Sequence, residues 1–351
     1  MFRRLLCYVL AAAFIPAVIS CNLIGKQRLY IYNWTYYTPD SIIEKFEEEY
    51  NVRVIYDEFA SNEDMFAKLT ANKSKRSSYD VVFPSNYYIP IMIREGMLEK
   101  IDKSKLTNLK NIDPDLLQKA AYDPVMDYSV PYFYGAAGVI VNRARVPDYE
   151  ESWSIFSRED LRGRMTMLDD MRDVMGGALV YLGDSVNSVN PSTVAAARDF
   201  INTSWKPNLV KFDSEAFGKG YANGDFWVVH AFPEVVYEEI EGNNQLVRDT
   251  VFFIPREGGP SYIDNMCILK NARNIDLAHK FIDFIHRPEI YAEFTDIFGL
   301  PATVNVPARQ LKTGLSWYLA EDLQKTELVN DLGEQLEMYH EAWFNSIRIG
   351  E

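Results

Sequence analysis

Residues 30–39 read Tyr30-Ile31-Tyr32-Asn33-Trp34-Thr35-Tyr36-Tyr37-Thr38-Pro39, an alternating apolar run that passes into an aromatic turn. The alternation predicts a β-strand, and Thr38 followed by Pro39 is typical of the capped start of a helix. Aromatic rings left in water forfeit roughly 1.5–3 kcal/mol of burial each. We therefore expect the rings of this turn to be covered, and a bound ligand is one way to cover them.

Short strands and helices continue to alternate after this turn. Strands are predicted at 29–32, 52–56 and 80–83, with an amphipathic helix between the first two that places Ile42 and Phe46 on one face. This rhythm is typical of an α/β fold with a mostly parallel sheet covered by helices. Ligand sites in such folds lie at the carboxyl ends of the strands.

Two extended runs, at 130–142 and 261–269, are predicted to cross between two lobes. Between them lies a second α/β region, with strands at 165–168 and 226–229 and helices at 171–182 and 192–205, and a helix at 276–286 follows the second run. More than one crossing predicts a two-lobed, periplasmic-binding-protein-like fold with a hinged interdomain cleft. The expected boundaries are 22–133 with 265–310 for one lobe and 134–264 with 311–351 for the other.

The first residues read as a leader. Arg3 and Arg4 precede the apolar run 5–19, and Ser20 precedes Cys21, so residues 1–20 are predicted to be a signal peptide and Cys21 a lipidation site. Val18 and Ile19 replace the residues usual before a lipidated cysteine, and an uncleaved N-terminal anchor is the alternative. In both cases the folded part is expected on the periplasmic side of the cytoplasmic membrane.

The net charge of the chain favours some classes of ligand over others. The formal net charge is −14, and loss of the two arginines of the leader would take it to −16. Such a chain repels phosphate groups and attracts cations, so nucleic acid is an unsuitable partner and a cationic ligand is favoured. Cys267 lies in an apolar run and is expected to be a core residue, with no disulfide in the chain.

Acidic residues follow a predicted strand in Asp169-Asp170-Met171-Arg172-Asp173. Asp170 and Asp173 could face the same way and bind one ammonium group, although acids in a first helical turn are also ordinary helix caps. Asp264, beside Tyr262, taken alone is typical of a turn. Together with rings at strand ends, these acids indicate a slot for a linear polymethylene amine, with carboxylates at the ammonium groups and rings along the hydrocarbon. The rings are Trp34, Tyr37, Tyr87 and Phe232.

Motifs in the same order along nearly the whole chain resemble the spermidine/putrescine-binding proteins of bacterial polyamine ABC transporters. They are Asn33-Trp34-Thr35, Ser61-Asn62-Glu63, Val82-Phe83-Pro84-Ser85-Asn86-Tyr87-Tyr88, Lys100-Ile101-Asp102-Lys103-Ser104-Lys105-Leu106-Thr107-Asn108, Asp113-Pro114-Asp115, Pro131-Tyr132, the segment 169–173 and Pro255-Arg256-Glu257-Gly258-Gly259.

The resemblance implies a polyamine ligand, permease subunits as partners, and neither cofactor nor metal. The polyamine-binding positions that it implies are Trp34, Thr35, Tyr37, Ser85, Tyr87, Asp170, Asp173, Ser214, Phe232, Tyr262 and Asp264. Three positions depart from the family pattern: Tyr36 replaces a glutamate, Leu300 a tyrosine and Val329 a glutamine. Because two polar partners are lost, the preference between putrescine and spermidine stays open.

Other functions fit the sequence less well. His230, His279, His286 and His340 show no metal-ligand spacing, and no nucleophile elbow or phosphate loop is present, so an enzyme is not expected. A ferric-iron-binding protein of the same fold is an alternative, because Tyr36-Tyr37 and Tyr87-Tyr88 are adjacent tyrosines. A tethered adhesin, which needs no interior site, is a further alternative.

Overall fold

The structure is a computed structural model that describes residues 26–35, 37–71 and 77–349. The predicted signal peptide 1–20, the proposed lipidation site Cys21 and the departure at Tyr36 lie outside the described residues. In the part of the chain that is described, no helix has both the length and the apolar character needed to cross a membrane.

The first sheet is built around the strand that contains the opening motif. β1 (Gln27–Trp34) lies between β2 (Val52–Phe59) and β3 (Val81–Val82), and both pairings are parallel. β10 (Pro260–Ile268) continues the sheet from β3 in the antiparallel sense, and β4 (Ser129–Gly135) pairs antiparallel with β10. The short β11 (Glu327–Leu328) pairs in parallel with the beginning of β10.

The second sheet has the strand order β7-β6-β8-β5-β9. β6 (Met165–Met167) pairs in parallel with β7 (Leu209–Phe212) and with β8 (Val228–Ala231). β5 (Gly138–Asn142) runs antiparallel to both β8 and β9 (Thr250–Phe253).

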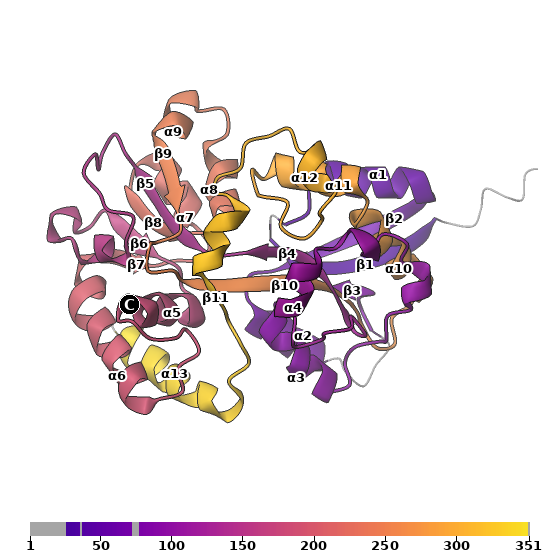
Figure 1. The fold of residues 1–351 in the computed structure, drawn as a ribbon, viewed down its shortest axis with the longest axis horizontal. Coiled ribbons are helices and arrows are strands. Elements are labelled where there is room, and N and C mark those ends of the chain that lie inside the picture. The colour runs from indigo at the N-terminus through magenta and orange to yellow at the C-terminus, as the bar shows by residue number, and fades with distance from the viewer. Residues whose placement is uncertain (1–25, 36, 72–76, 350–351) are drawn as a thin grey trace, which may run out of the picture.

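Helices surround each sheet and give the molecule two lobes (Figure 1). Around the first sheet lie α1 (Asp40–Tyr50), α2 (Asn62–Ala71), α3 (Ile89–Arg94), α4 (Pro114–Lys119), α10 (Ile275–Ile285), α11 (Pro288–Ile297) and α12 (Ala308–Leu311). Around the second lie α5 (Met171–Tyr181), α6 (Pro191–Phe200), α7 (Phe217–Asn223), α8 (Pro233–Ile240), α9 (Asn244–Asp249) and α13 (Leu336–Ala342).

The two-lobed α/β architecture expected from the sequence is confirmed, but the sheets are mixed rather than mostly parallel. The antiparallel pairings come from the strands that carry the chain between lobes, because β4 and β5 are separated only by Ala136 and Ala137, and β9 leads through 254–259 into β10. Figure 1 shows β4 and β10 extending between the lobes. A third segment, 312–335, leaves α12 and includes β11 before the chain reaches α13.

The start of α1 differs from the sequence expectation. Thr38 is not its cap: the N-cap is Pro39, without a side-chain hydrogen bond. The Thr38 hydroxyl instead accepts a hydrogen bond of 3.0 Å from the buried amide of Asn33, and it lies 3.1 Å from the hydroxyl of Tyr132. The polar groups of the turn after β1 are therefore used to fix that turn against β4.

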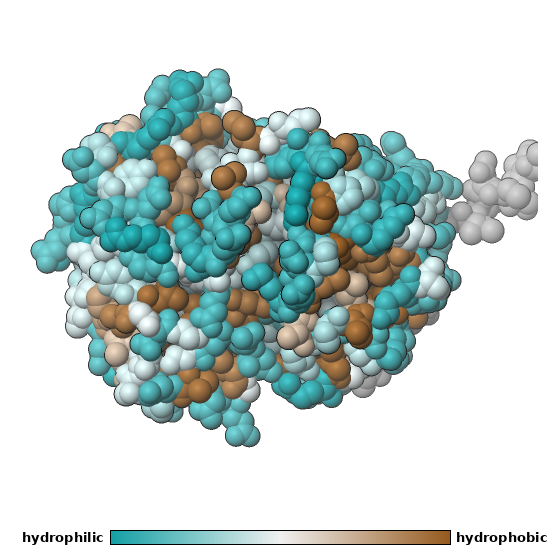
Figure 2. Space-filling model, in the orientation of Figure 1, coloured by the Kyte–Doolittle hydropathy of each residue, from teal (hydrophilic) through white to brown (hydrophobic). Residues whose placement is uncertain are grey.

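One apolar cluster extends through both lobes: it contains the fully buried Ile31 and Phe281 of the first lobe and Val229 of the second. A separate cluster lies in the second lobe, where Trp153 and Trp205 pack with their ring centroids 5.9 Å apart and Tyr339 of α13 joins them. The surface in Figure 2 is largely hydrophilic, with apolar side chains in separate patches.

Candidate functional site

Asp264 lies at the centre of the candidate site. Its Oδ2 accepts a hydrogen bond of 2.7 Å from the hydroxyl of Tyr37, and its Oδ1 accepts one of 2.6 Å from the hydroxyl of Ser85. The Asp264 residue is only 3% exposed. Segments from the turn after β1, the turn after β3 and the middle of β10 therefore meet at one buried carboxyl group.

Asn62, at the start of α2, holds the second turn in place. Its side-chain amide donates to the Ser85 hydroxyl at 3.1 Å and to the Tyr87 hydroxyl at 2.9 Å, while its carbonyl oxygen accepts from the Ser85 amide at 3.1 Å. Because Asn62 is itself buried, these bonds are shielded from water. Asn62 thus positions two of the expected binding residues.

Trp34 is the last residue of β1, and Thr35 follows it in the turn. The Trp34 indole donates to the carbonyl of Phe83 at 2.9 Å, and its ring packs on Phe59 with centroids 4.7 Å apart. Thr35 has its hydroxyl 3.5 Å from the carbonyl of Phe59. Both residues are only half-buried, so part of the Trp34 ring surface is left for a further contact.

Asp170 and Asp173 come from the second lobe. Asp170 is the N-cap of α5, and its Oδ1 accepts from the amides of Arg172 and Asp173 at 2.8 and 3.0 Å. The capping role considered from the sequence is thus present. Asp173, 8% exposed, has no hydrogen-bond donor to its carboxyl group among the described residues. Its carboxyl group is therefore available to a cationic ligand.

Phe232 and Tyr262 form the aromatic contact between α8 and β10. Their rings meet edge to face with centroids 5.7 Å apart. Phe232 is the N-cap residue of α8, and two residues later comes Glu234, which is 5% exposed. The sequence analysis did not single out Glu234, although its place just after β8 follows the same rule of strand carboxyl ends that pointed to Asp170.

Burial dominates the electrostatics of these acids. Removal from water raises the pKa of Asp264 to about 7, against the opposing hydrogen bonds from Ser85 and Tyr37. Burial likewise raises the pKa of Glu234 to about 7, with the charge of Asp264 adding to the effect. Burial and the neighbouring charges of Asp170 and Asp264 raise the pKa of Asp173 well above its usual value. A cation bound here would favour the ionised form of all three acids and so lower their pKa values.

One of the expected binding positions, Ser214, lies apart from the buried acids. Ser214 is exposed, and its hydroxyl accepts from the backbone amide of Asp169 at 2.9 Å, so it lies beside the acidic segment rather than among the buried acids. At the departures from the family pattern, Leu300 and Val329 are buried apolar residues. The Val329 carbonyl accepts a hydrogen bond of 2.6 Å from Asn86, whose own carbonyl oxygen accepts from the Ile263 amide at 3.0 Å.

The tyrosines do not favour an iron site. Burial raises the pKa values of Tyr37, Tyr87 and Tyr88 above the ordinary phenol value, which disfavours the phenolate that iron requires. The Tyr88 hydroxyl donates a hydrogen bond of 3.0 Å to Oε1 of Glu63. Among the described residues no group of three or more histidine, cysteine, aspartate or glutamate side chains is placed to hold a metal ion.

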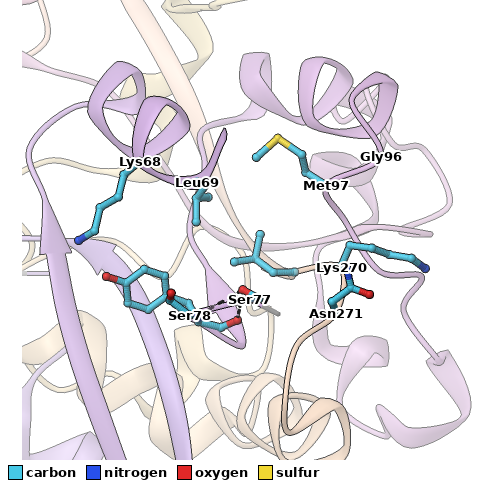
Figure 3. Close-up of a pocket in the computed structure, with 10 residues that line it drawn as sticks. Lys68, Leu69, Ser77, Ser78, Gly96, Met97, Lys270 and Asn271 are labelled. Atoms are coloured by element: carbon cyan, nitrogen blue, oxygen red, sulfur yellow. Dashed lines mark hydrogen bonds between the residues drawn. The ribbon is translucent and has the colours of Figure 1, made fainter. Parts of the chain in front are cut away.

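A separate cavity of about 140 Å³ lies on the first lobe (Figure 3). Lys68 and Leu69 of α2 border it, with Met97, Lys270 and Asn271 on another side. Its charged lining residues are lysines. It therefore offers a polyamine no counter-charge, unlike the acids between the lobes.

Comparison with known proteins places the chain in a family. The profile described as "Bacterial extracellular solute-binding protein" matches residues 41–313. The "Spermidine/putrescine-binding periplasmic protein" of Escherichia coli is 35% identical over 347 residues, which cover 97% of each chain. The "Putrescine/cadaverine-binding protein" of Pseudomonas aeruginosa is 31% identical over 285 residues, covering 78% of this chain and 79% of that protein.

Solved structures of similar proteins support the same family assignment. The crystal structure of the TpPotD lipoprotein of Treponema pallidum is similar with a TM-score of 0.87 and 48% identity, covering 91% of this chain and 99% of that one. A putative spermidine/putrescine ABC transporter protein from Listeria monocytogenes gives a TM-score of 0.80 at 32% identity, covering 93% and 100%. These relatives are binding proteins rather than enzymes. The chain belongs to the bacterial extracellular solute-binding proteins, in the family of spermidine/putrescine-binding proteins.

Proposed function

We propose that this protein binds a polyamine between its lobes and delivers it to the permease of an ABC transporter. The observation that carries the proposal is the set of buried carboxyl groups Asp173, Asp264 and Glu234, which lack a cationic side chain bonded to them among the described residues. Buried charges are stable only when paired, so such a set calls for a cationic ligand.

The acids and aromatic rings of the candidate site suit a linear amine. Asp170 and Asp173 would take one ammonium end through charge-assisted hydrogen bonds, and Asp264 would take a second protonated nitrogen. Trp34, Phe232 and Tyr262, half-buried around them, offer ring faces to the methylene groups and cation–π attraction to the nitrogens. Tyr37, Ser85 and Tyr87 would hold Asp264 and the wall beside it. Thr35 and Ser214 are proposed as polar contacts at the margin.

The names of the relatives support the ligand class. They bind spermidine, putrescine or cadaverine according to their names, and one is a lipoprotein. We extend the lipoprotein form to this chain as a proposal, with Cys21 as the lipidated residue and the folded part held at the periplasmic face of the cytoplasmic membrane. The lobe boundaries 22–133 with 265–310, and 134–264 with 311–351, belong to the same proposal.

Calorimetric titration of the folded chain tests this function. Putrescine and spermidine are expected to bind with micromolar or tighter dissociation constants, which corresponds to roughly −8 kcal/mol or better. Butylamine, with the same carbon chain as putrescine but one ammonium group, is the control and should bind at least a hundredfold more weakly. Equal binding of butylamine and putrescine would contradict paired carboxylates as the recognition element.

The iron alternative is tested in the same samples. A phenolate–iron site gives a visible absorption band, so ferric citrate should leave the protein colourless if the polyamine function is right. A band that appears with ferric citrate and that spermidine does not alter would favour the iron-binding function instead.

A further inference from the structure

Glu234 is a buried acid with one carboxyl oxygen that forms no hydrogen bond among the described residues. It lies in the first turn of α8 and is 5% exposed, and the unbonded oxygen is its Oε2. An acid in a first helical turn gains from the helix dipole, but that gain does not require burial. Burying a carboxyl oxygen that nothing bonds costs free energy, so the position calls for a partner that the chain does not itself supply.

The surroundings of Glu234 direct it toward the site already described. Phe232, the N-cap of the same helix, contacts Tyr262 with ring centroids 5.7 Å apart. Tyr262 and Asp264 are two residues apart on β10, and side chains at that spacing share one face of a strand. The start of α8 is thus packed against the face of β10 that carries Asp264.

The hydroxyl groups of Tyr262 and Tyr318 lie in the same part of the site. Gly135 pairs with Tyr262 across the β4–β10 ladder, and a Cβ at Gly135 would lie 3.0 Å from the Tyr262 hydroxyl and 3.2 Å from the Tyr318 hydroxyl. Burial raises the pKa values of both tyrosines and of Tyr37, and the charge of Glu234 adds to each shift. The hydroxyl groups of Tyr262 and Tyr318 thus lie close together beside β10, the strand that Phe232 of α8 contacts.

Asp264 lies between the other acids of the site. It lies on β10, which contacts α5, the helix of Asp170 and Asp173, and which also contacts Phe232 at the start of α8 through Tyr262. The acids therefore come from two helices packed on β10 and from β10 itself, and we take them as a row with Asp170 and Asp173 at one end, Asp264 in the middle and Glu234 at the other end. A linear triamine has three protonated nitrogens in a row, whereas a linear diamine has two.

We propose that Glu234 is the third anionic position of this site and that the row is built for a linear triamine of the spermidine type. The proposal rests on the polyamine-binding function proposed above. One terminal ammonium lies at Asp170 and Asp173, the secondary ammonium at Asp264 and the other terminal ammonium at Glu234. A diamine fills only two of these positions and leaves one buried acid unpaired.

Glu234→Gln tests the assignment, because it removes the charge and keeps the shape. Its matched control is Glu238→Gln, the same change on an exposed position one turn further along α8. Titrations of wild type and both variants with putrescine and spermidine give the ratio of the two dissociation constants. We expect Glu234→Gln to weaken spermidine binding at least tenfold and to lower the preference for spermidine over putrescine at least fivefold, with Glu238→Gln unchanged.

Other results overturn the assignment. A preference that falls less than fivefold in Glu234→Gln means that Glu234 does not hold the third nitrogen, while tight binding of both amines to wild type would leave the proposed function standing. A wild type that binds neither amine overturns the proposed function itself.

A measurement on the wild type keeps the inference testable if the variant does not fold. Titration near pH 7 in buffers with different ionisation heats gives the number of protons released on binding. Spermidine should release more protons than putrescine, because it ionises one more buried acid. Equal proton release by the two amines would overturn the assignment.

Discussion

The hydroxyl of Tyr37 donates a hydrogen bond of 2.7 Å to Oδ2 of Asp264, a residue 227 positions further along the chain. The bond favours the ionised form of Asp264 and so opposes the effect of burial on its pKa. It also ties the turn after β1 to β10, one of the strands that connect the lobes. The aromatic turn and the central acid of the site therefore depend on each other.

Tyr37→Phe removes that hydroxyl and keeps the ring. We expect polyamine affinity to fall about tenfold, because a hydrogen bond to a charged group contributes roughly 1.5–3 kcal/mol and a bound ligand needs Asp264 ionised. Calorimetry at pH 7 measures the loss. The control is Tyr221→Phe, which removes a buried hydroxyl 2.8 Å from Thr250 in the second lobe and should lower stability without changing affinity.

If Tyr37→Phe bound polyamine as tightly as wild type, the contact between Tyr37 and Asp264 would be a structural bond only. The hydrogen bond from Ser85 would then be the one that favours the ionised form of Asp264.

Affinity should depend on pH because the pKa values of Asp264 and Glu234 are both about 7. Polyamine nitrogens stay protonated in this range, so binding must remove protons from the acids. We expect affinity to rise between about pH 6 and 8, by up to about tenfold per pH unit for each proton released, and to level off above. Calorimetry across this range measures the rise. An affinity that is flat from pH 6 to 8 would contradict buried, protonated acids.

The stability of the ligand-free protein should change in the opposite direction. The pKa values of Asp264 and Glu234 are higher in the folded state than in the unfolded chain, so the folded state holds the extra protons between about pH 4.5 and 7. The contribution of these two groups is greatest below that range and is lost as the pH rises through about 7. Thermal unfolding with and without spermidine should show the largest ligand-induced increase in melting temperature above pH 7.

Asp170→Asn separates charge from capping. Asparagine is as good an N-cap as aspartate, so the bonds to the amides of Arg172 and Asp173 should persist and the melting temperature of the ligand-free protein should not fall. Polyamine affinity is expected to fall tenfold or more. Unchanged affinity would assign Asp170 to capping alone. Asp170→Ala is the companion variant and should also lose about 1 kcal/mol of stability.

Trp34→Ala removes the ring that ends β1. Affinity should fall severalfold, since a cation–π contact contributes about 0.5–2 kcal/mol and the methylene groups of the ligand would lose a covering surface. Trp34→Phe keeps a ring but loses the indole bond to the Phe83 carbonyl, and should lose less affinity. Binding by Trp34→Ala at the wild-type level would place the aromatic wall elsewhere.

Local patterns predicted much of the fold. The strand and aromatic turn at 30–37 needed only alternation and turn chemistry, and the helix at 276–286 was found within one residue of α10. The direction of the strands was not predictable, because β10 pairs with β3 and β4 across more than a hundred residues and nothing local encodes that partner. The capping role assigned to Thr38 was wrong, since its hydroxyl is engaged by Asn33.

Several expected positions lie together where residue type and strand position agreed, while their binding role stays a prediction. The hydrogen bonds that Asp264 accepts from Tyr37 and Ser85 bring three of the expected positions together. Ser214 was expected from the resemblance alone. Glu234 was missed because Phe232-Pro233-Glu234 is typical of any helix start, and its burial depends on a contact with Tyr262 on a strand that comes later in the chain.

The late arrival of β10 has a consequence for how the chain folds. β10 separates β3 from β4 in the first sheet, so that sheet is incomplete until residue 268 has been made, and Tyr339 and Trp343 join the core of the second lobe later still. A chain made from its N-terminus therefore cannot complete the first sheet or the second-lobe cluster before these late residues exist. Because pairings this distant in sequence form slowly, we expect most of the tertiary structure to form only after nearly the whole chain has been synthesised.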